Sequence, residues 1–240
     1  MAKSEIALVV GVGPGLGAAL ARCFARAGMR VAMAARDGDR LQPLARDLVD
    51  LGGQGRAYDC DAASESDVET LFGRVKADLG EPNLVVYNAG AFVRRSILET
   101  ERDEFERCWR IGCLGGFLVG RAAARVMTAR AEGGGAGGSI LFTGATASLR
   151  GGAGFANLAV GKFGLRALTQ SMARELGPKG VHVGHVVIDG IIASERSGGQ
   201  KPDQSQLDPD AIAESYLAIH RQPRSVWTLE LDLRPWVEKF

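Results

Sequence analysis

The chain has few of the residues that characterise metal-binding, disulfide-rich or membrane-spanning proteins. Its four cysteines form no Cys-x-x-Cys pair and its three histidines show no ligand spacing, which argues against a zinc site or a disulfide framework. No apolar run approaches 18 residues, so we expect no membrane span. A basic excess is also missing, because 29 lysines and arginines face 28 acidic residues, and this argues against a nucleic-acid partner. We therefore expect a reduced, cytoplasmic protein.

Glycine, by contrast, is abundant, at 33 of 240 residues. Short apolar runs alternate along the chain with stretches of helical periodicity. The runs predict strands at 6–10, 31–35, 55–60, 84–87, 139–143, 181–188 and 226–231. The periodic stretches predict helices at 16–27, 41–51, 64–79, 102–131, 155–176 and 210–220. Such alternation indicates an α/β protein, with one doubly wound parallel sheet of seven strands, helices on both faces and a single domain over residues 1–240.

One long polar segment interrupts this alternation. Residues 194–209 (SERSGGQKPDQSQLDP) are rich in glycine, proline and charge, and they are long for a connector. Long connectors often close over a substrate, so the segment is a candidate mobile lid. Plain disorder explains the same composition.

Glycines cluster between the first strand and the first helix, in the sequence VGVGPGLG at residues 10–17. Their spacing is Gly-x-x-x-Gly-x-Gly through Gly11, Gly15 and Gly17. Glycines here let the backbone turn tightly and let a pyrophosphate approach the positive end of the helix. The loop predicts a dinucleotide site, and a purely structural turn is the alternative.

The end of the second strand indicates which dinucleotide is bound. Dinucleotide folds that prefer NAD usually carry an acidic residue there for the ribose 2′-hydroxyl. This strand ends in Arg36, whose guanidinium can pair with a 2′-phosphate. NADP(H) is therefore favoured, while Asp37, the next residue, keeps NAD(H) possible.

These features together resemble the short-chain dehydrogenase/reductase family. Residues 10–17 resemble its TGxxxGxG loop, Cys60-Asp61 resembles the motif after its third strand, and Asn88-Ala89-Gly90 matches its NAG motif. The resemblance implies a Rossmann fold, a nicotinamide dinucleotide, a small-molecule substrate and a homodimer or homotetramer built on two long helices. The cofactor-binding residues that loop and resemblance together imply are Gly11, Gly13, Gly15, Leu16, Gly17, Arg36, Asp61, Asn88, Ala89, Gly90, Lys162 and Gly190.

The catalytic positions depart from the family pattern. The family uses Asn, Ser, Tyr and Lys, and its Tyr-x-x-x-Lys motif aligns with residues 158–162. Lys162 is present, and the resemblance implies that it positions the nicotinamide ribose. The usual Tyr, Ser and Asn positions are occupied by Leu158, Ala145 and Gly112. Leucine and alanine can neither donate a proton nor hold a carbonyl, so the family's usual carbonyl chemistry is in doubt.

Two functions follow from this mixture. The favoured one is an NADP(H)-dependent oxidoreductase of the short-chain type with a non-standard active site. Its substrate then either needs no tyrosine acid, as for an iminium or an activated alkene, or is protonated by another group. The alternative is a catalytically impaired dinucleotide-binding protein that acts as a sensor or a partner subunit. Possible replacements for the acid are Thr146, Ser148, Asn157, His182, His185, Tyr216 and His220, although capping, a turn or packing explains each of them as well.

Overall fold

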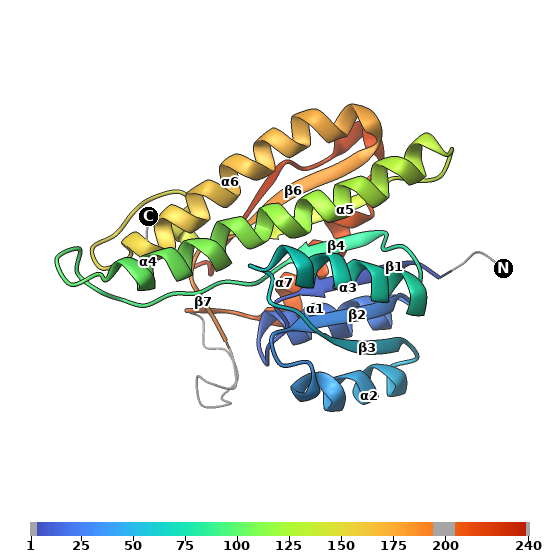
Figure 1. Cartoon of the computed structure of the whole chain (residues 1–240), viewed down its shortest axis with the longest axis horizontal. Helices are drawn as coiled ribbons and strands as arrows, with labels where there is room; N and C mark the ends of the chain where they lie inside the picture. The colour runs from blue at the N-terminus through green and yellow to red at the C-terminus, as the bar shows by residue number, and fades with distance from the viewer. Residues whose placement is uncertain (1–3, 194–204, 239–240) are drawn as a thin grey trace.

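A seven-stranded parallel sheet forms the centre of the protein, as a computed structural model that describes residues 4–193 and 205–238 shows (Figure 1). Its strand order is β3-β2-β1-β4-β5-β6-β9, and every neighbouring pair is parallel. The strands are β1 (Ile6–Val10), β2 (Arg30–Ala35), β3 (Gln54–Asp59), β4 (Leu84–Tyr87), β5 (Gly138–Thr143), β6 (Val181–Ile188) and β9 (Glu230–Leu233). The order reverses between β1 and β4, and the predicted doubly wound sheet is confirmed.

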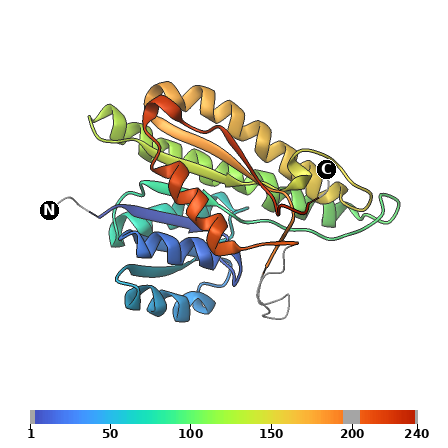
Figure 2. The same ribbon diagram turned by 180° about the vertical axis from the view of Figure 1, so that it is seen from behind.

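Helices cover both faces of this sheet (Figures 1 and 2). One face carries α1 (Leu16–Arg26), α2 (Gln42–Asp50) and α7 (Pro209–His220). The other face carries α3 (Glu65–Asp78), α5 (Gly115–Glu132) and α6 (Ala156–Leu176), and α4 (Arg102–Trp109) leads into α5. Because both faces are covered, the inner strands β1, β4 and β6 are buried along their whole length. The edge strands β3 and β9 keep polar residues that are partly or fully exposed.

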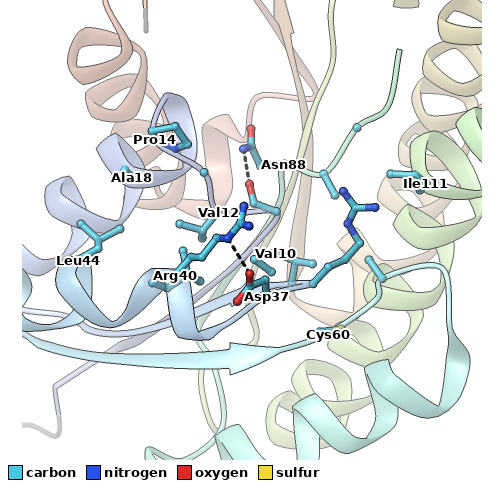
Figure 3. Close-up of a pocket in the computed structure, with 18 of the residues that line it drawn as sticks. Val10, Val12, Pro14, Ala18, Asp37, Arg40, Leu44, Cys60, Asn88 and Ile111 are labelled. Atoms are coloured by element: carbon cyan, nitrogen blue, oxygen red, sulfur yellow. Dashed lines mark hydrogen bonds and ion pairs between the residues drawn. The ribbon is translucent and has the colours of Figure 1, made fainter. Parts of the chain in front are cut away.

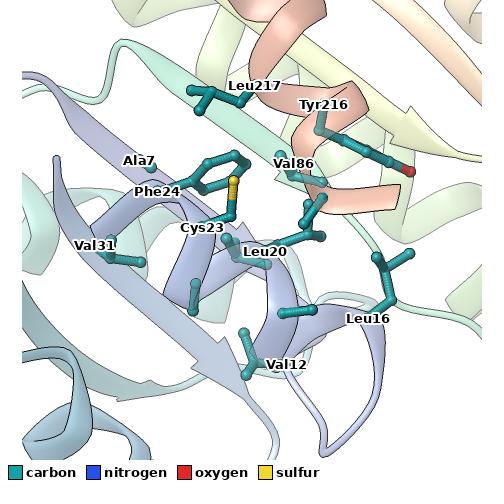
Figure 4. Packing of buried hydrophobic residues seen from close by; sticks show 14 of the residues in the cluster. Ala7, Val12, Leu16, Leu20, Cys23, Phe24, Val31, Val86, Tyr216 and Leu217 are labelled. Atoms are coloured by element: carbon teal, nitrogen blue, oxygen red, sulfur yellow. The ribbon is translucent and has the colours of Figure 1, made fainter. Parts of the chain in front are cut away.

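The central strand β1 illustrates this double burial. Ala7 and Val9 belong to the apolar cluster under α1 and α7, while Leu8 and Val10 belong to the cluster under α3 and α5. Successive side chains of a strand point to opposite faces, so the uninterrupted apolar run IALVV supplies both clusters. Figure 4 shows the first cluster, in which Phe24 of α1 lies between the sheet and α7.

The helix predicted over 102–131 is interrupted by a wider turn. A π-helical turn at Arg110–Leu114 separates α4 from α5. The Tyr87 hydroxyl donates a hydrogen bond to the Ile111 carbonyl at this turn. A Cβ at Gly115 would lie 2.3 Å from the same hydroxyl oxygen, so only glycine lets the helix pass over Tyr87. Inserted side chains of this kind are a known cause of π turns, which often occur at functional sites.

This helical stretch is also notable for its apolar content. By length and composition alone, Arg102–Glu132 could cross a membrane. Its inner residues Leu118, Val119, Ala123 and Met127 lie in the cluster between α5 and the sheet. The buried part of this apolar composition therefore packs within the fold, while Trp109 and Phe117 stay exposed.

The last strand begins later than predicted, at Glu230 rather than residue 226. Residues Arg224–Val226 form a 3-10 turn instead. The Gln222 side chain explains the difference, because its Oε1 accepts from the Thr228 amide and its Nε2 donates to the Thr228 hydroxyl. These bonds occupy Thr228 before the chain reaches the sheet.

The candidate lid at 194–209 is described only in part. Residues 194–204 lie outside the described residues. On either side of them, β7 (Ile191–Ile192) and β8 (Gln206–Leu207) form a separate two-stranded parallel sheet that the sequence did not predict. The lid assignment stays a prediction.

Candidate functional site

A cavity of about 860 Å³ lies at the carboxyl ends of the central strands, where the strand order reverses (Figure 3). Parallel α/β sheets bind ligands at this edge. Seven of the predicted cofactor-binding residues line the cavity: Gly11, Gly13, Arg36, Asp61, Asn88, Ala89 and Gly90. The fold therefore brings together four segments that are far apart in the sequence.

The glycine loop is shaped by a close approach between the ends of β1 and β4. Gly11 has φ +94°, and a Cβ there would lie 2.4 Å from the backbone nitrogen of Ala89. The Asn88 side-chain amide donates to the Gly11 carbonyl over 3.0 Å, which holds the two strand ends together (Figure 3). A Cβ at Gly17 would meet Val12 Cα at 2.7 Å, whereas Gly13 has open space around it. Gly11 and Gly17 thus keep the loop compact, and Gly13 keeps its surface bare toward the cavity.

The loop leads directly into the first turn of α1, which has no side-chain cap. Gly15 is the N-cap residue, and no acidic residue occupies the first turn. The first amides of a helix have no partner within the helix, so they can donate to an anion. The side chain of Leu16 packs in the core rather than in the cavity (Figure 4). Any part that Leu16 takes in binding is therefore through its backbone amide.

Arginines line the other side of the cavity, at the end of β2. Arg36 is exposed and makes no hydrogen bond or ion pair within the described residues. Arg40 forms an ion pair with Asp37, with 2.7 Å between Nε and Oδ2 (Figure 3). Arg22 of α1 also lines the cavity. The sequence analysis missed Arg22 and Arg40. The signal for Arg22 is its place one helical turn after Ala18, which also lines the cavity.

Asp61 and the end of β3 complete this side. Asp61 Oδ1 accepts from the Ala63 amide over 2.9 Å, so the carboxylate already caps the start of the next loop. The side chain is exposed at the cavity wall. It can contact a ligand with its second oxygen.

Lys162 lies deeper, beyond the lined cavity. It is only 6% exposed, and its Nζ donates to the Thr143 carbonyl over 2.6 Å. Burial lowers the pKa of the ammonium to about 8, since a charged group is less stable away from water. A Cβ at Gly90 would lie 3.9 Å from Nζ, which places the lysine next to the NAG segment. A Lys162 ammonium has further N–H donors to offer a ligand.

Gly190 does not line the cavity either. It has φ +149° after β6, and a Cβ there would lie 2.9 Å from Leu207 and 3.0 Å from Pro235. The glycine is required by these neighbours. Its predicted contact with a cofactor stays a prediction.

The structure places the three residues at which the sequence predicts a departure from the family pattern in or beside three different elements. Leu158 lies on the first turn of α6, four residues before Lys162. Ala145 follows β5, and its amide donates to Ser148. Gly112 lies in the π turn against Gly161 of α6, where a Cβ would be 3.5 Å from the Gly161 Cα.

The nearby hydroxyls are engaged in the fold, whereas Asn157 is engaged only through its Nδ2 and its buried Oδ1 has no hydrogen-bond partner within the described residues. The Thr146 hydroxyl donates to Asp189 over 2.5 Å. The buried Tyr216 hydroxyl shares a hydrogen bond of 2.8 Å with the Thr143 hydroxyl. The Asn157 amide donates to the Val93 carbonyl over 2.8 Å.

A buried network supports the chain segment after β5. Arg166 holds Glu230 with two hydrogen bonds, and Glu230 accepts from His185 Nδ1 over 3.0 Å. Since a carboxylate can only accept here, Nδ1 carries the proton and Nε2 accepts from the Ser148 hydroxyl over 3.4 Å. Burial lowers the pKa of His185 to about 4, in spite of Glu230. A Cβ at Gly144 would lie 2.4 Å from His185 Nε2, so the ring packs directly against the β5 end.

Comparison with known proteins places this arrangement among dehydrogenases. Residues 5–205 match the family model described as short chain dehydrogenase. A solved short-chain dehydrogenase from Rhodopseudomonas palustris is 39% identical, with a TM-score of 0.84 over 97% of this chain and 99% of that chain. An alcohol dehydrogenase from the archaeon Thermococcus sibiricus, complexed with 5-hydroxy-NADP, is 26% identical, with a TM-score of 0.88 over 98% of each chain. The (21S)-21-acetoxyl-apo-melianone synthase SDR of Melia azedarach is 32% identical over 203 residues, which are 83% of this chain and 72% of that protein.

The neutral His185 makes the fold sensitive to mild acid. Between pH 7 and pH 5 the unfolded chain takes up a proton at His185, with an ordinary pKa of 6.5, while the folded chain does not, so unfolding becomes easier. The contribution is up to about 2 kcal/mol of unfolding free energy. Urea unfolding at the two pH values measures it, and His185→Gln shrinks the difference by that amount.

The other two histidines also have lowered pKa values, so some acid sensitivity remains in the variant. If the free energy of unfolding falls between pH 7 and pH 5 by as much in His185→Gln as in the natural chain, His185 is not the source of the acid sensitivity. If the variant does not fold, a side-chain NMR titration of the natural chain replaces it, and a His185 pKa above 6 has the same meaning.

Proposed function

Because the chain belongs to the short-chain dehydrogenase/reductase family, we propose that it is an NADP(H)-dependent oxidoreductase that acts on a small organic substrate by hydride transfer. The observation that carries the proposal is the cavity at the switch point, where a bare glycine loop, an uncapped helix start and Arg36 converge. Each of these features suits a phosphate group. The bound nicotinamide supplies the hydride.

The residues present fit the dinucleotide along the whole cavity. The glycine loop and the first amides of α1 would hold the pyrophosphate, because a Cβ at Gly11 or Gly17 would meet backbone atoms and the space above Gly13 is open. Arg36, with Arg40 beside it, would hold the 2′-phosphate. Lys162 Nζ would hold the ribose hydroxyls near Gly90. The Thermococcus sibiricus relative, complexed with 5-hydroxy-NADP, supports the choice of the phosphorylated cofactor.

The second half of the proposal is that the active site is non-standard. Leu158, Ala145 and Gly112 supply neither an acid nor a hydrogen bond to a carbonyl oxygen. Lys162 lies one helical turn after Leu158, and its Nζ, with a pKa of about 8, can hold and release a proton near neutral pH. A substrate that already carries positive charge, such as an iminium, or an activated alkene makes a smaller demand on the missing acid.

The simultaneous absence of the three polar side chains also supports a second candidate function. A protein that binds the dinucleotide without turnover, as a sensor or a partner subunit, needs the glycine loop and Arg36 but none of the catalytic groups. Turnover separates the two candidates, since both require binding.

We also propose that the chain forms a homodimer or homotetramer and works in the cytoplasm. Trp109, Val160 and Phe163 expose apolar side chains on α4 and α6, and burial against a second copy would remove them from water. All four cysteines are free thiols, which suits a reducing compartment.

Titration with NADPH and NADH, followed by nicotinamide fluorescence, tests the cofactor half. NADPH binds more tightly than NADH, and Arg36→Ala weakens NADPH binding by roughly 10- to 100-fold, because a charge-assisted hydrogen bond is lost. NADH binding stays unchanged in Arg36→Ala. Arg26→Ala, an exposed arginine of α1 outside the cavity, is the matched control. Absence of binding to either nucleotide removes both candidate functions.

Restoring the family's catalytic pair tests the active-site half. The double variant Leu158→Tyr with Ala145→Ser gains ketone reduction with NADPH, by roughly 10²- to 10⁴-fold over the natural chain, because a general acid is supplied. Each single substitution gains less. The readout is NADPH consumption against ketones, imines and activated alkenes. If the natural chain turns over imines or activated alkenes, the oxidoreductase is supported. If it turns over none of the three substrate types, the binding protein is supported. If it reduces ketones as fast as the double variant does, the active site is not non-standard.

The molar mass in solution tests the assembly. Light scattering gives at least twice the 25.3 kDa of one chain, and Phe163→Glu lowers this value by placing a charge in the apolar contact. Val49→Glu, at an exposed apolar position on α2, leaves the mass unchanged. A natural chain of 25.3 kDa shows that the proposed contact does not form.

A further inference from the structure

Two stacked rings and a guanidinium over one of them lie beyond the NAG segment, and one of the rings lines the cavity; this set of Phe92, Phe155 and Arg94 is called the column. The rings of Phe92 and Phe155 are stacked, with 4.8 Å between centroids and 16° between planes. The guanidinium carbon of Arg94 lies 5.6 Å from the centroid of Phe155. Offset-stacked rings and a cation near a ring centroid are both attractive arrangements. The column has no part in dinucleotide binding as argued above.

The two loops that carry the column are fastened to each other. The Arg95 amide donates to the Gly154 carbonyl over 3.2 Å, and Asn157 donates to the Val93 carbonyl over 2.8 Å. Arg95 also forms an ion pair of 3.1 Å with Glu104 of α4. These bonds flank both rings, so the position of Phe92 is fixed by the backbone as well as by stacking.

Phe92 is the member of the column that reaches the cavity. It lines the cavity together with Gly90 and Ala91, and its side chain remains 43% exposed although Phe155 is stacked on it. Gly90 lies beside Lys162, and Leu158 follows Phe155 on the first turn of α6. The exposed ring surface therefore lies at the catalytic end of the cavity, away from Arg36.

We propose that the substrate contains a planar aromatic or conjugated ring and that this ring stacks on the exposed surface of Phe92, as the next layer of the column. This inference rests on the proposed oxidoreductase function and names its substrate class. A flat ring gains quadrupole attraction from Phe92 that a saturated ring of the same size lacks. Arg94 makes no ion pair within residues 4–193 and 205–238, so the rings themselves hold it in the column.

A matched pair of ketones tests the proposal with the full chain. The probes are 2-acetylnaphthalene and 2-acetyldecalin, which share a carbon skeleton but differ in planarity. Their dissociation constants are measured with NADPH saturating, from the change in bound nicotinamide fluorescence. The natural chain binds the aromatic ketone about 3- to 10-fold more tightly, which is the size expected for one stacked pair.

Phe92→Leu removes this preference, because leucine keeps an apolar contact but has no ring. It leaves NADPH affinity and the binding of 2-acetyldecalin unchanged. Phe117→Leu is the matched control, since Phe117 is similarly exposed at 39% and also lies under a guanidinium, that of Arg121, but it does not line the cavity. If Phe92→Leu does not fold by circular dichroism, Phe92→Met, which also keeps an apolar contact without a ring, takes its place.

The outcomes separate the two proposals. No binding of NADPH to the natural chain removes the proposed function and this inference with it. Three results overturn the stacking site alone, provided that NADPH binds normally. The two ketones bind with equal affinity, neither ketone binds, or the preference for the aromatic ketone survives in Phe92→Leu.

Discussion

The parallel pairing of β1 with both β2 and β4 is the constraint on which the rest of the structure depends. The strand order runs outward from β1 and β4 in both directions, so α1 and α2 cover one face of the sheet while α3 and α5 cover the other. The carboxyl ends of β1 and β4 therefore open toward solvent between the two layers of helices. The same pairing also brings Gly11 so close to Ala89 that no side chain fits between them. The Asn88 amide then locks the two ends through the Gly11 carbonyl. The cavity, the arginines that line it and the glycine loop all lie next to this contact between Gly11 and the NAG segment.

Along the cavity the chemistry changes from polar to apolar. The dinucleotide end offers backbone amides and guanidinium groups, which suit phosphates. At the opposite end, Ala91, Phe92 and Ile111 line the cavity, and Lys162 lies deeper, beyond the lining. The hydroxyls that lie close by are committed to the fold, as Ser148 is to Ala145 and His185. In the function that we propose, directional bonds hold the cofactor at the first end, and shape and apolar surface select the substrate at the second.

The sequence was sufficient where local pattern decides structure. The uniform apolar run of β1 and the loop at residues 10–17 predicted the sheet and the position of the cavity, and both rest on nearest neighbours in the chain. The sequence did not predict local structure that depends on a side chain far away in the chain. The π turn depends on Tyr87, some 24 residues before Ile111, and the partner of His185 lies 45 residues away in β9. Contacts between residues so far apart in the chain produce no periodic pattern in the sequence. The roles of Lys162 and Gly190 toward a cofactor stay predictions.

The contact between Gly112 and Gly161 limits how the chain can evolve. The π turn and α6 meet there at backbone distance, with a Cβ on either glycine already touching the other residue's Cα at 3.4–3.5 Å. A methyl group at residue 112 would therefore make an ordinary contact with α6, whereas a longer side chain has to extend past the Gly161 backbone. The residue type at either position thus limits the size of side chain that the other can carry.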